Sequence, residues 1–193
     1  MGWGGWGETR VLNTSPELNG VEMFVYTRPA GLIGRWIGRS LRFGVRRFAF
    51  ITEGQGTANG GSPLKRVEVE ANSLVPLCEV DMNKFERLPL TISEVMRVEK
   101  RTRESVLDAP RYPRIVYTLD GETDSEIAGV LDLHGERHAV SCSKTVDGPE
   151  LVVRCPIDAR NFKIPMFSIM QGLFSVSPHV EVETRIPSRV LKI

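Results

Sequence analysis

Two stretches near the end of the chain alternate between apolar and polar side chains. Their apolar-side positions are Leu151, Val153, Cys155 and Ile157, and then Val180, Val182, Thr184 and Ile186. A period of two residues is that of a β-strand with one buried face and one solvated face. Strands of this kind are typical of antiparallel sheets, so the pattern predicts an antiparallel barrel or sandwich.

An apolar segment rich in methionine and phenylalanine lies between these two predicted strands. Its members are Ile164, Met166, Phe167, Ile169, Met170, Leu173 and Phe174. Methionine is flexible and polarizable, so it suits an interior that must adapt its shape. The segment therefore predicts either the lining of a cavity for an apolar ligand or a core that the protein fills with its own side chains.

Further strands are predicted upstream at short, regular spacing. Their ranges are 21–27, 41–52, 64–71, 74–81, 113–119, 125–133 and 137–144, with Gly135 in a hairpin turn. Short strands with one inserted helix indicate an all-β barrel or sandwich. Because no linker divides the pattern, we expect one domain over residues 20–193, preceded by a loosely ordered arm, residues 1–19.

The one predicted helix covers residues 92–107. Thr91 and Glu94 form a capping box at its start, and Pro110 marks its end. The apolar stripe expected to face the core consists of Ile92, Val95, Met96, Thr102 and Val106.

Composition excludes several classes of function. The 193 residues carry a net charge of +1, which gives no nucleic-acid signature, and no apolar run is long enough to span a bilayer. The first ten residues lack the features of a secretory signal peptide. We therefore expect a cytoplasmic protein, with membrane association as an alternative, whose cysteines Cys78, Cys142 and Cys155 are buried free thiols.

No catalytic motif stands out in the sequence. It contains no nucleophile elbow, no phosphate-binding loop and no zinc-protease motif. His134 and His138 flank the predicted hairpin turn, where a spacing of four residues favours surface histidines over metal ligands. We expect no enzymatic activity, no metal and no cofactor other than a bound lipid or quinone.

Residues 28–47 form an Arg-rich segment with six arginines and no acidic residue. On a helix, Arg35, Arg39 and Arg42 would lie opposite an apolar side that includes Trp36, as in an element that binds membrane surfaces. Several glycines oppose a long helix here, and Leu41 begins a strand-like alternation. The segment is therefore interpreted either as contact with membrane headgroups or as a basic loop entering a strand.

Four segments together resemble the YceI-like family. They are VYTRPAGLIGRWIGRSLRFGVRRFAF, SVLDAPRYPRIVYTLDG, IAGVLDLHGERHAVSC and IDARNFKIPMFSIMQGLFSVSPHVEVETRIP, and the resemblance covers about residues 20–187. It implies an eight-stranded antiparallel lipocalin-like barrel that binds a polyisoprenoid, an isoprenoid quinone or a similar lipid in its lumen. One branch of the family has a Gly-His pair where this chain has Gly38 and Arg39, so a role for that histidine is not carried over.

The favoured function is thus non-catalytic binding of a long apolar ligand. The expected lining residues are Phe24, Trp36, Met166, Phe167, Met170, Leu173 and Phe174. One alternative is a filled barrel that acts as an interaction or scaffold module through its Arg-rich surface. A second alternative is an enzyme that acts on an apolar substrate in the same lumen. The sequence leaves both a monomer and a homodimer open.

Overall fold

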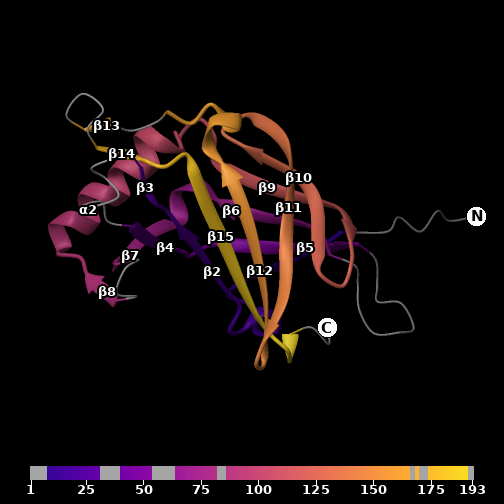
Figure 1. Ribbon diagram of the computed structural model, residues 1–193. Coiled ribbons are helices and arrows are strands. Elements are labelled where there is room, and N and C mark those ends of the chain that lie inside the picture. The colour runs from indigo at the N-terminus through magenta and orange to yellow at the C-terminus, as the bar shows by residue number, and fades with distance from the viewer. Residues whose placement is uncertain are drawn as a thin grey trace, which may run out of the picture.

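The computed structural model describes residues 8–30, 40–53, 64–81, 86–165, 168–169 and 174–190. Within them, one antiparallel sheet of twelve strands curls around a common interior, and a single α-helix lies against it (Figure 1). This arrangement confirms the predicted all-β class with one inserted helix.

The order of strands in the large sheet departs from the order in the sequence. It runs β1 (Glu8–Leu12), β5 (Phe48–Glu53), β6 (Leu64–Glu70), β9 (Arg114–Glu122), β10 (Glu126–Leu133), β11 (Glu136–Asp147), β12 (Glu150–Asp158), β15 (His179–Pro187), β2 (Glu22–Tyr26), β4 (Ser40–Val45), β7 (Leu74–Asp81) and β8 (Glu86–Pro89). A small second sheet joins β13 (Ser168–Ile169), β14 (Phe174–Val176) and β3 (Pro29–Ala30).

One bent hairpin explains why the strand count exceeds the expected eight. Strands β4 and β5 follow each other directly, separated by Arg46 and Arg47, and β6 and β7 are separated by the 3₁₀ turn η2 (Ala71–Ser73). At this break the Arg46 amide donates to the Ser73 carbonyl at 3.0 Å, and the Glu70 amide donates to Arg47 at 3.1 Å. The predicted strand 41–52 is therefore divided into β4 and β5, whereas β6 and β7 match the separately predicted strands 64–71 and 74–81. Strands β1 and β8 add short outer strands.

The same hairpin contributes to both ends of the strand order. Its first half, β5 with β6, pairs with β9, whereas its second half, β4 with β7, pairs with β2. The curled sheet therefore returns on itself through this one element. Strand β1, which pairs with β5, also gives regular structure to part of the arm expected at residues 1–19.

The inner face of the sheet is apolar, as the period of two predicts. Val182 and Ile186 of β15 face inward, whereas Glu183 and Arg185 face outward. One buried cluster gathers around Phe162, which is 1% exposed, and includes Leu107, Leu131 and Leu133. A second gathers around Phe48 and includes Met23, Val45 and Ile186.

Helix α2 (Ile92–Arg101) begins at the predicted capping box and runs into a π-helical turn, η3 (Thr102–Val106). The Thr91 amide donates to a Glu94 carboxylate oxygen at 2.8 Å, and the Glu94 amide donates to the Thr91 hydroxyl at 3.3 Å. These reciprocal bonds satisfy two amides that a helix start would otherwise leave without partners.

The expected inward stripe is wrong at the start of the helix, whereas its last two members, Thr102 and Val106 in η3, do line the cavity. Ile92 is 82% exposed and Met96 is 66% exposed, and the side facing the interior instead carries Arg97, Val98 and Arg101. The helix lies across the edge of the curled sheet rather than within a core (Figure 1), so an apolar stripe is not required on it.

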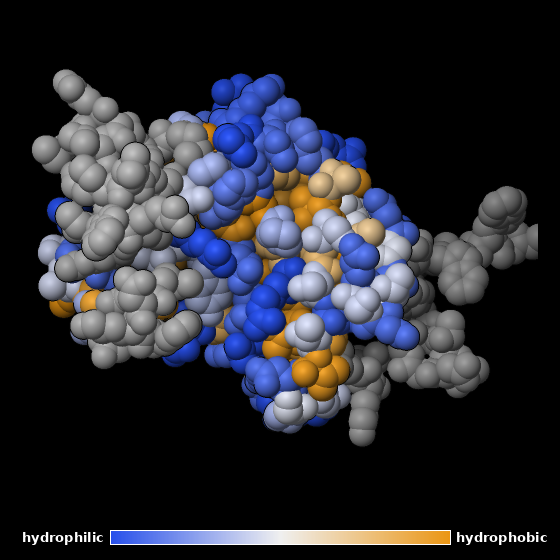
Figure 2. All heavy atoms as spheres, in the orientation of Figure 1, coloured by the Kyte–Doolittle hydropathy of each residue, from blue (hydrophilic) through white to orange (hydrophobic). Residues whose placement is uncertain are grey.

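The outer face of β12 and β15 carries a network of ion pairs around Glu183. This carboxylate is 5% exposed and accepts hydrogen bonds from Arg154 at 2.9 Å and Arg185 at 2.8 Å. Arg185 also contacts Glu150 at 3.2 Å. Burial opposes the ionisation of Glu183, but the hydrogen bonds from Arg185 and Arg154 outweigh it and hold its pKa below the ordinary value. Figure 2 shows this face as mainly hydrophilic, with apolar residues between the charged ones.

Replacing Glu183 with Gln should lower the free energy of unfolding at neutral pH by about 1–3 kcal/mol, because two arginines lose a buried acceptor. A carboxyl whose pKa is lowered on folding stabilises the protein above its unfolded pKa, and that contribution is lost as pH falls through the folded pKa. Denaturant unfolding below pH 5 should therefore show a shallower acid loss for Glu183→Gln than for the wild type. Glu150→Gln, at a more exposed carboxylate, is the matched control, and equal acid slopes for Glu183→Gln and the wild type would contradict the assignment.

Candidate ligand-binding cavity

The curled sheet encloses a cavity of about 820 Å³. Its wall is built from inward side chains of the strands, among them Val25, Phe43, Leu131, Val140 and Val182. Volumes of roughly 300–1,000 Å³ with mostly apolar walls are typical of sites that bind small organic ligands. The interior of this sheet is therefore not filled by the side chains that line it.

The described wall has few polar groups, and they lie either deep in the interior or near helix α2. Tyr117 lies in the interior, where its hydroxyl is 3.0 Å from the Val140 carbonyl and 3.2 Å from the Ile127 carbonyl. Burial raises the pKa of Tyr117 to about 12, so the phenol stays neutral and donates to the backbone. The other groups include Thr27 and the helix arginines, which are considered below.

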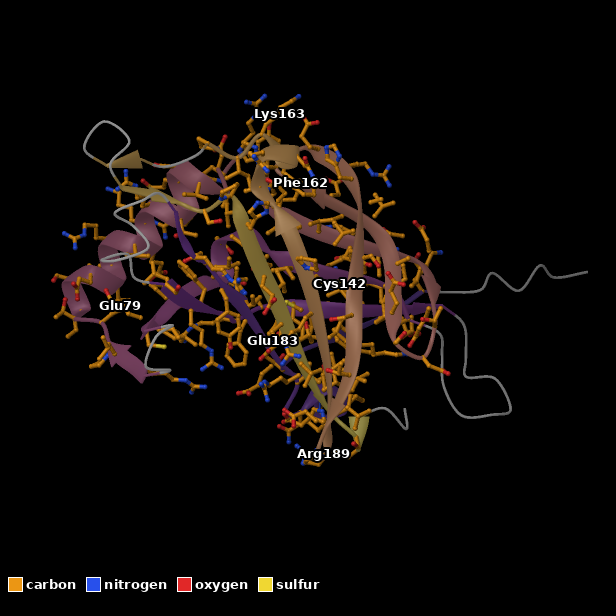
Figure 3. The ribbon with its side chains drawn as sticks, in the orientation of Figure 1. Glu79, Cys142, Phe162, Lys163, Glu183 and Arg189 are labelled. Atoms are coloured by element: carbon orange, nitrogen blue, oxygen red, sulfur yellow. A yellow bond between two sulfur atoms is a disulfide. The ribbon has the colours of Figure 1, made fainter. Side chains whose placement is uncertain are left out.

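A disulfide between Cys142 and Cys155 lines the cavity, which corrects the expectation that these cysteines are free thiols. The two residues face each other across β11 and β12, because Ser143 pairs with Arg154 in the adjacent register. Figure 3 labels Cys142 on β11 at the middle of the sheet. Cys78 is free and buried, as expected.

The sequence contains a signal for this disulfide in the positions of the two cysteines relative to the turn between their strands. Cys142 precedes Gly148 by six residues, and Cys155 follows Pro149 by six residues. Since Gly148 and Pro149 form the turn between β11 and β12, equal distances from the turn place the two cysteines opposite each other.

Phe24 and Arg42 do not line the cavity. Within β2, Met23 and Val25 point inward, so the alternation of the strand directs Phe24 to the outer face. There the Arg42 guanidinium lies 3.7 Å from the centre of the Phe24 ring and 5.7 Å from that of Tyr26. This cation–π contact packs Arg42 against its own sheet, and its role in headgroup contact stays a prediction.

The other sequence-predicted site residues lie outside the described residues or have side chains outside them. These residues are Arg35, Trp36, Arg39, Met166, Phe167, Met170 and Leu173, together with the side chain of Phe174. Their roles in lining the lumen and in contacting headgroups stay predictions. Ile164 and Pro165, at the start of the same segment, do line the cavity.

His134 and His138 pack around Phe162 at the end of the β10–β11 hairpin. The Nδ1 atom of His134 lies 3.2 Å from the Phe162 carbonyl, and the His138 ring meets the Phe162 ring edge-on at 5.2 Å. Within the described part of the chain, no group of three or more metal-binding side chains comes together. In that same part, no helix combines the length and the apolarity needed to cross a membrane.

The solved structures provide the comparison for this fold. BcnA from Burkholderia cenocepacia matches with a TM-score of 0.52 at 10% sequence identity, over 86% of this chain and 94% of BcnA. The chain has the fold of BcnA. This likeness confirms the YceI-like resemblance at the level of the fold.

A second match is a polyisoprenoid binding domain from Saccharophagus degradans implicated in plant cell wall breakdown, with a TM-score of 0.49 at 11% identity over 92% of this chain and 95% of that one. No protein-family model and no curated protein sequence matches the chain.

Alkylation of the denatured protein should label one thiol without reductant and three after reduction, because only Cys78 is free. Replacing both Cys142 and Cys155 with Ala should lower the free energy of unfolding by about 3 kcal/mol, the loop-entropy value for a bridge that closes about 15 residues. Mass spectrometry of the alkylated chain and urea unfolding measure these two effects, and Cys78→Ala is the control for the loss of a cysteine. Labelling of three thiols without reductant would contradict the disulfide.

Proposed function

We propose that the protein binds a long apolar ligand, such as a polyisoprenoid lipid or an isoprenoid quinone, inside the curled sheet without converting it chemically. The observation that supports this function is the cavity of about 820 Å³ with a wall of aliphatic and aromatic side chains. A lipocalin-like barrel around this lumen is the architecture proposed here, with the bent hairpin as its closing element.

The energetics of burial favour a ligand over an empty interior. Each methylene-sized group of an apolar chain gains roughly 0.8 kcal/mol on leaving water, so a few isoprene units suffice for tight binding. An unfilled cavity lowers the stability of the folded protein, because the side chains that line it lose packing contacts. A scaffold that used only its outer surface would have no need for this internal volume.

Binding without catalysis agrees with the chemistry of the described wall. It contains neither a carboxylate nor an imidazole, and its cysteines are joined in a disulfide. The Tyr117 phenol is neutral and bonded to the backbone. These residues offer no pair of groups that could act as nucleophile and base on a bound chain.

Replacing Val182 with Phe tests this function, because Val182 lines the cavity on β15. The larger ring should occupy ligand volume and reduce the lipid that organic solvent extracts from the purified protein, while leaving the protein folded. Mass spectrometry of the extract and the melting temperature are the two measurements. Returning the extracted lipid to stripped wild-type protein should raise its melting temperature.

Val152→Phe is the matched control on the neighbouring strand. Val152 is fully buried and does not line the cavity, so the same exchange should overpack the structure and destabilise it by about 1–3 kcal/mol without emptying the folded fraction of lipid. If wild-type protein from its native host yields no lipid, or if both variants lose lipid equally, the proposed function is wrong.

A further inference from the structure

We infer that the preferred ligand carries an anionic head, a phosphate or diphosphate, which Arg97 and Arg101 of α2 hold at the rim of the cavity. This inference rests on the proposed function and narrows it. Among the neutral and charged lipids that could fill the lumen, it selects an apolar chain with a phosphorylated end.

Arg97 and Arg101 are the basic side chains in the described wall of the cavity. They lie four residues apart on α2, so they occupy the same side of the helix, one above the other. Both side chains also reach solvent. An arginine in such a position places its aliphatic stem along an apolar wall and its guanidinium at the edge where water begins.

Two hydroxyl groups reach the cavity from strand ends near this rim. Thr27 accepts a hydrogen bond from the Leu41 amide at 3.1 Å, and Ser177 accepts one from the His179 amide at 3.1 Å. These two bonds use the acceptor capacity of the hydroxyl oxygens and do not involve their protons. The Ser177 amide donates to the Arg28 carbonyl at 2.8 Å, which brings this residue beside the end of β2.

The helix is joined to the same end of the lumen through β7. Strand β7 packs against α2 and pairs with β4, where Leu41 lines the cavity. Glu79, opposite Leu41 on β7, is buried near the helix but is not part of the cavity wall. The polar donors of the lumen thus gather at the α2 end, whereas the wall beyond them is apolar except for Tyr117 and Thr184.

This distribution of charge suits an anionic amphiphile. Guanidinium groups stay protonated at any physiological pH and match phosphate oxygens with paired hydrogen bonds. A neutral head would gain nothing from the positive charge of these two side chains. A chain anchored by its head at α2 would extend its apolar part into the lumen, where the wall is aliphatic and aromatic.

Calorimetric titration of lipid-stripped protein with farnesyl phosphate, farnesol and inorganic phosphate separates the contributions of chain and head. The wild type should bind farnesyl phosphate about tenfold more tightly than farnesol, a modest factor because the arginines are partly solvated. The double variant Arg97→Gln, Arg101→Gln should bind farnesyl phosphate and farnesol with equal affinity. Its affinity for farnesol should be that of the wild type. The variant with Lys at both positions should keep part of the preference, because it keeps the charge.

The matched control removes two positive charges away from the cavity, one from α2 and one from the adjoining turn η3, by Lys100→Gln with Arg103→Gln. It should keep the preference for farnesyl phosphate, since neither residue lines the cavity. Equal wild-type affinities for farnesyl phosphate and farnesol would overturn the headgroup inference and leave the proposed function standing. No binding of either chain would instead refute the proposed function. Binding of inorganic phosphate as tight as that of farnesyl phosphate would assign the arginines to free phosphate and also overturn the inference.

Discussion

The bent hairpin formed by β4–β5 and β6–β7 determines the shape of everything else in this structure. The hydrogen bonds of Arg46 to Ser73 and of Glu70 to Arg47 keep its two arms together where both strands change direction. One half then pairs with β9 and the other with β2, so the sheet curls back on itself, with β1 and β8 as its outermost strands. The interior exists because this one element serves both ends of the sheet.

The curl of the sheet also fixes which side chains line its interior. Residues such as Val140, Val153 and Val182, on the neighbouring strands β11, β12 and β15, are modest in size. The inward side chains together leave a cavity of about 820 Å³. The charged positions between them meet on the outside, where Glu183 binds Arg154 and Arg185. The same alternation that produces an apolar lumen therefore produces the ion-pair network on its outer surface.

The strand pattern was predictable from the sequence because alternation is a local property, and the capping box located the start of α2 for the same reason. The break at Arg46 and Arg47 was not predictable, because it depends on how the strands pair. The outward side of Phe24 and the bond between Cys142 and Cys155 were missed, although strand alternation and the equal distances of the two cysteines from the turn are signals for them. Arg97 and Arg101 were also missed, since a helix stripe was expected to be apolar and the sequence does not show that α2 lies across a cavity rim. The residues predicted from the Met/Phe segment stay predictions, apart from its start at Ile164.

Position within the lumen, more than residue type, distinguishes the polar groups and the disulfide deep in the wall from the charged side chains at the rim. The Tyr117 hydroxyl is buried and occupied by backbone carbonyls, and the disulfide joins two neighbouring strands of the wall. Arg97 and Arg101 differ from both, because they line the cavity and reach water at once. A ligand with one apolar end and one charged end is the kind of molecule that uses both properties, and that is why the rim, rather than the deep wall, should determine which lipid the protein selects.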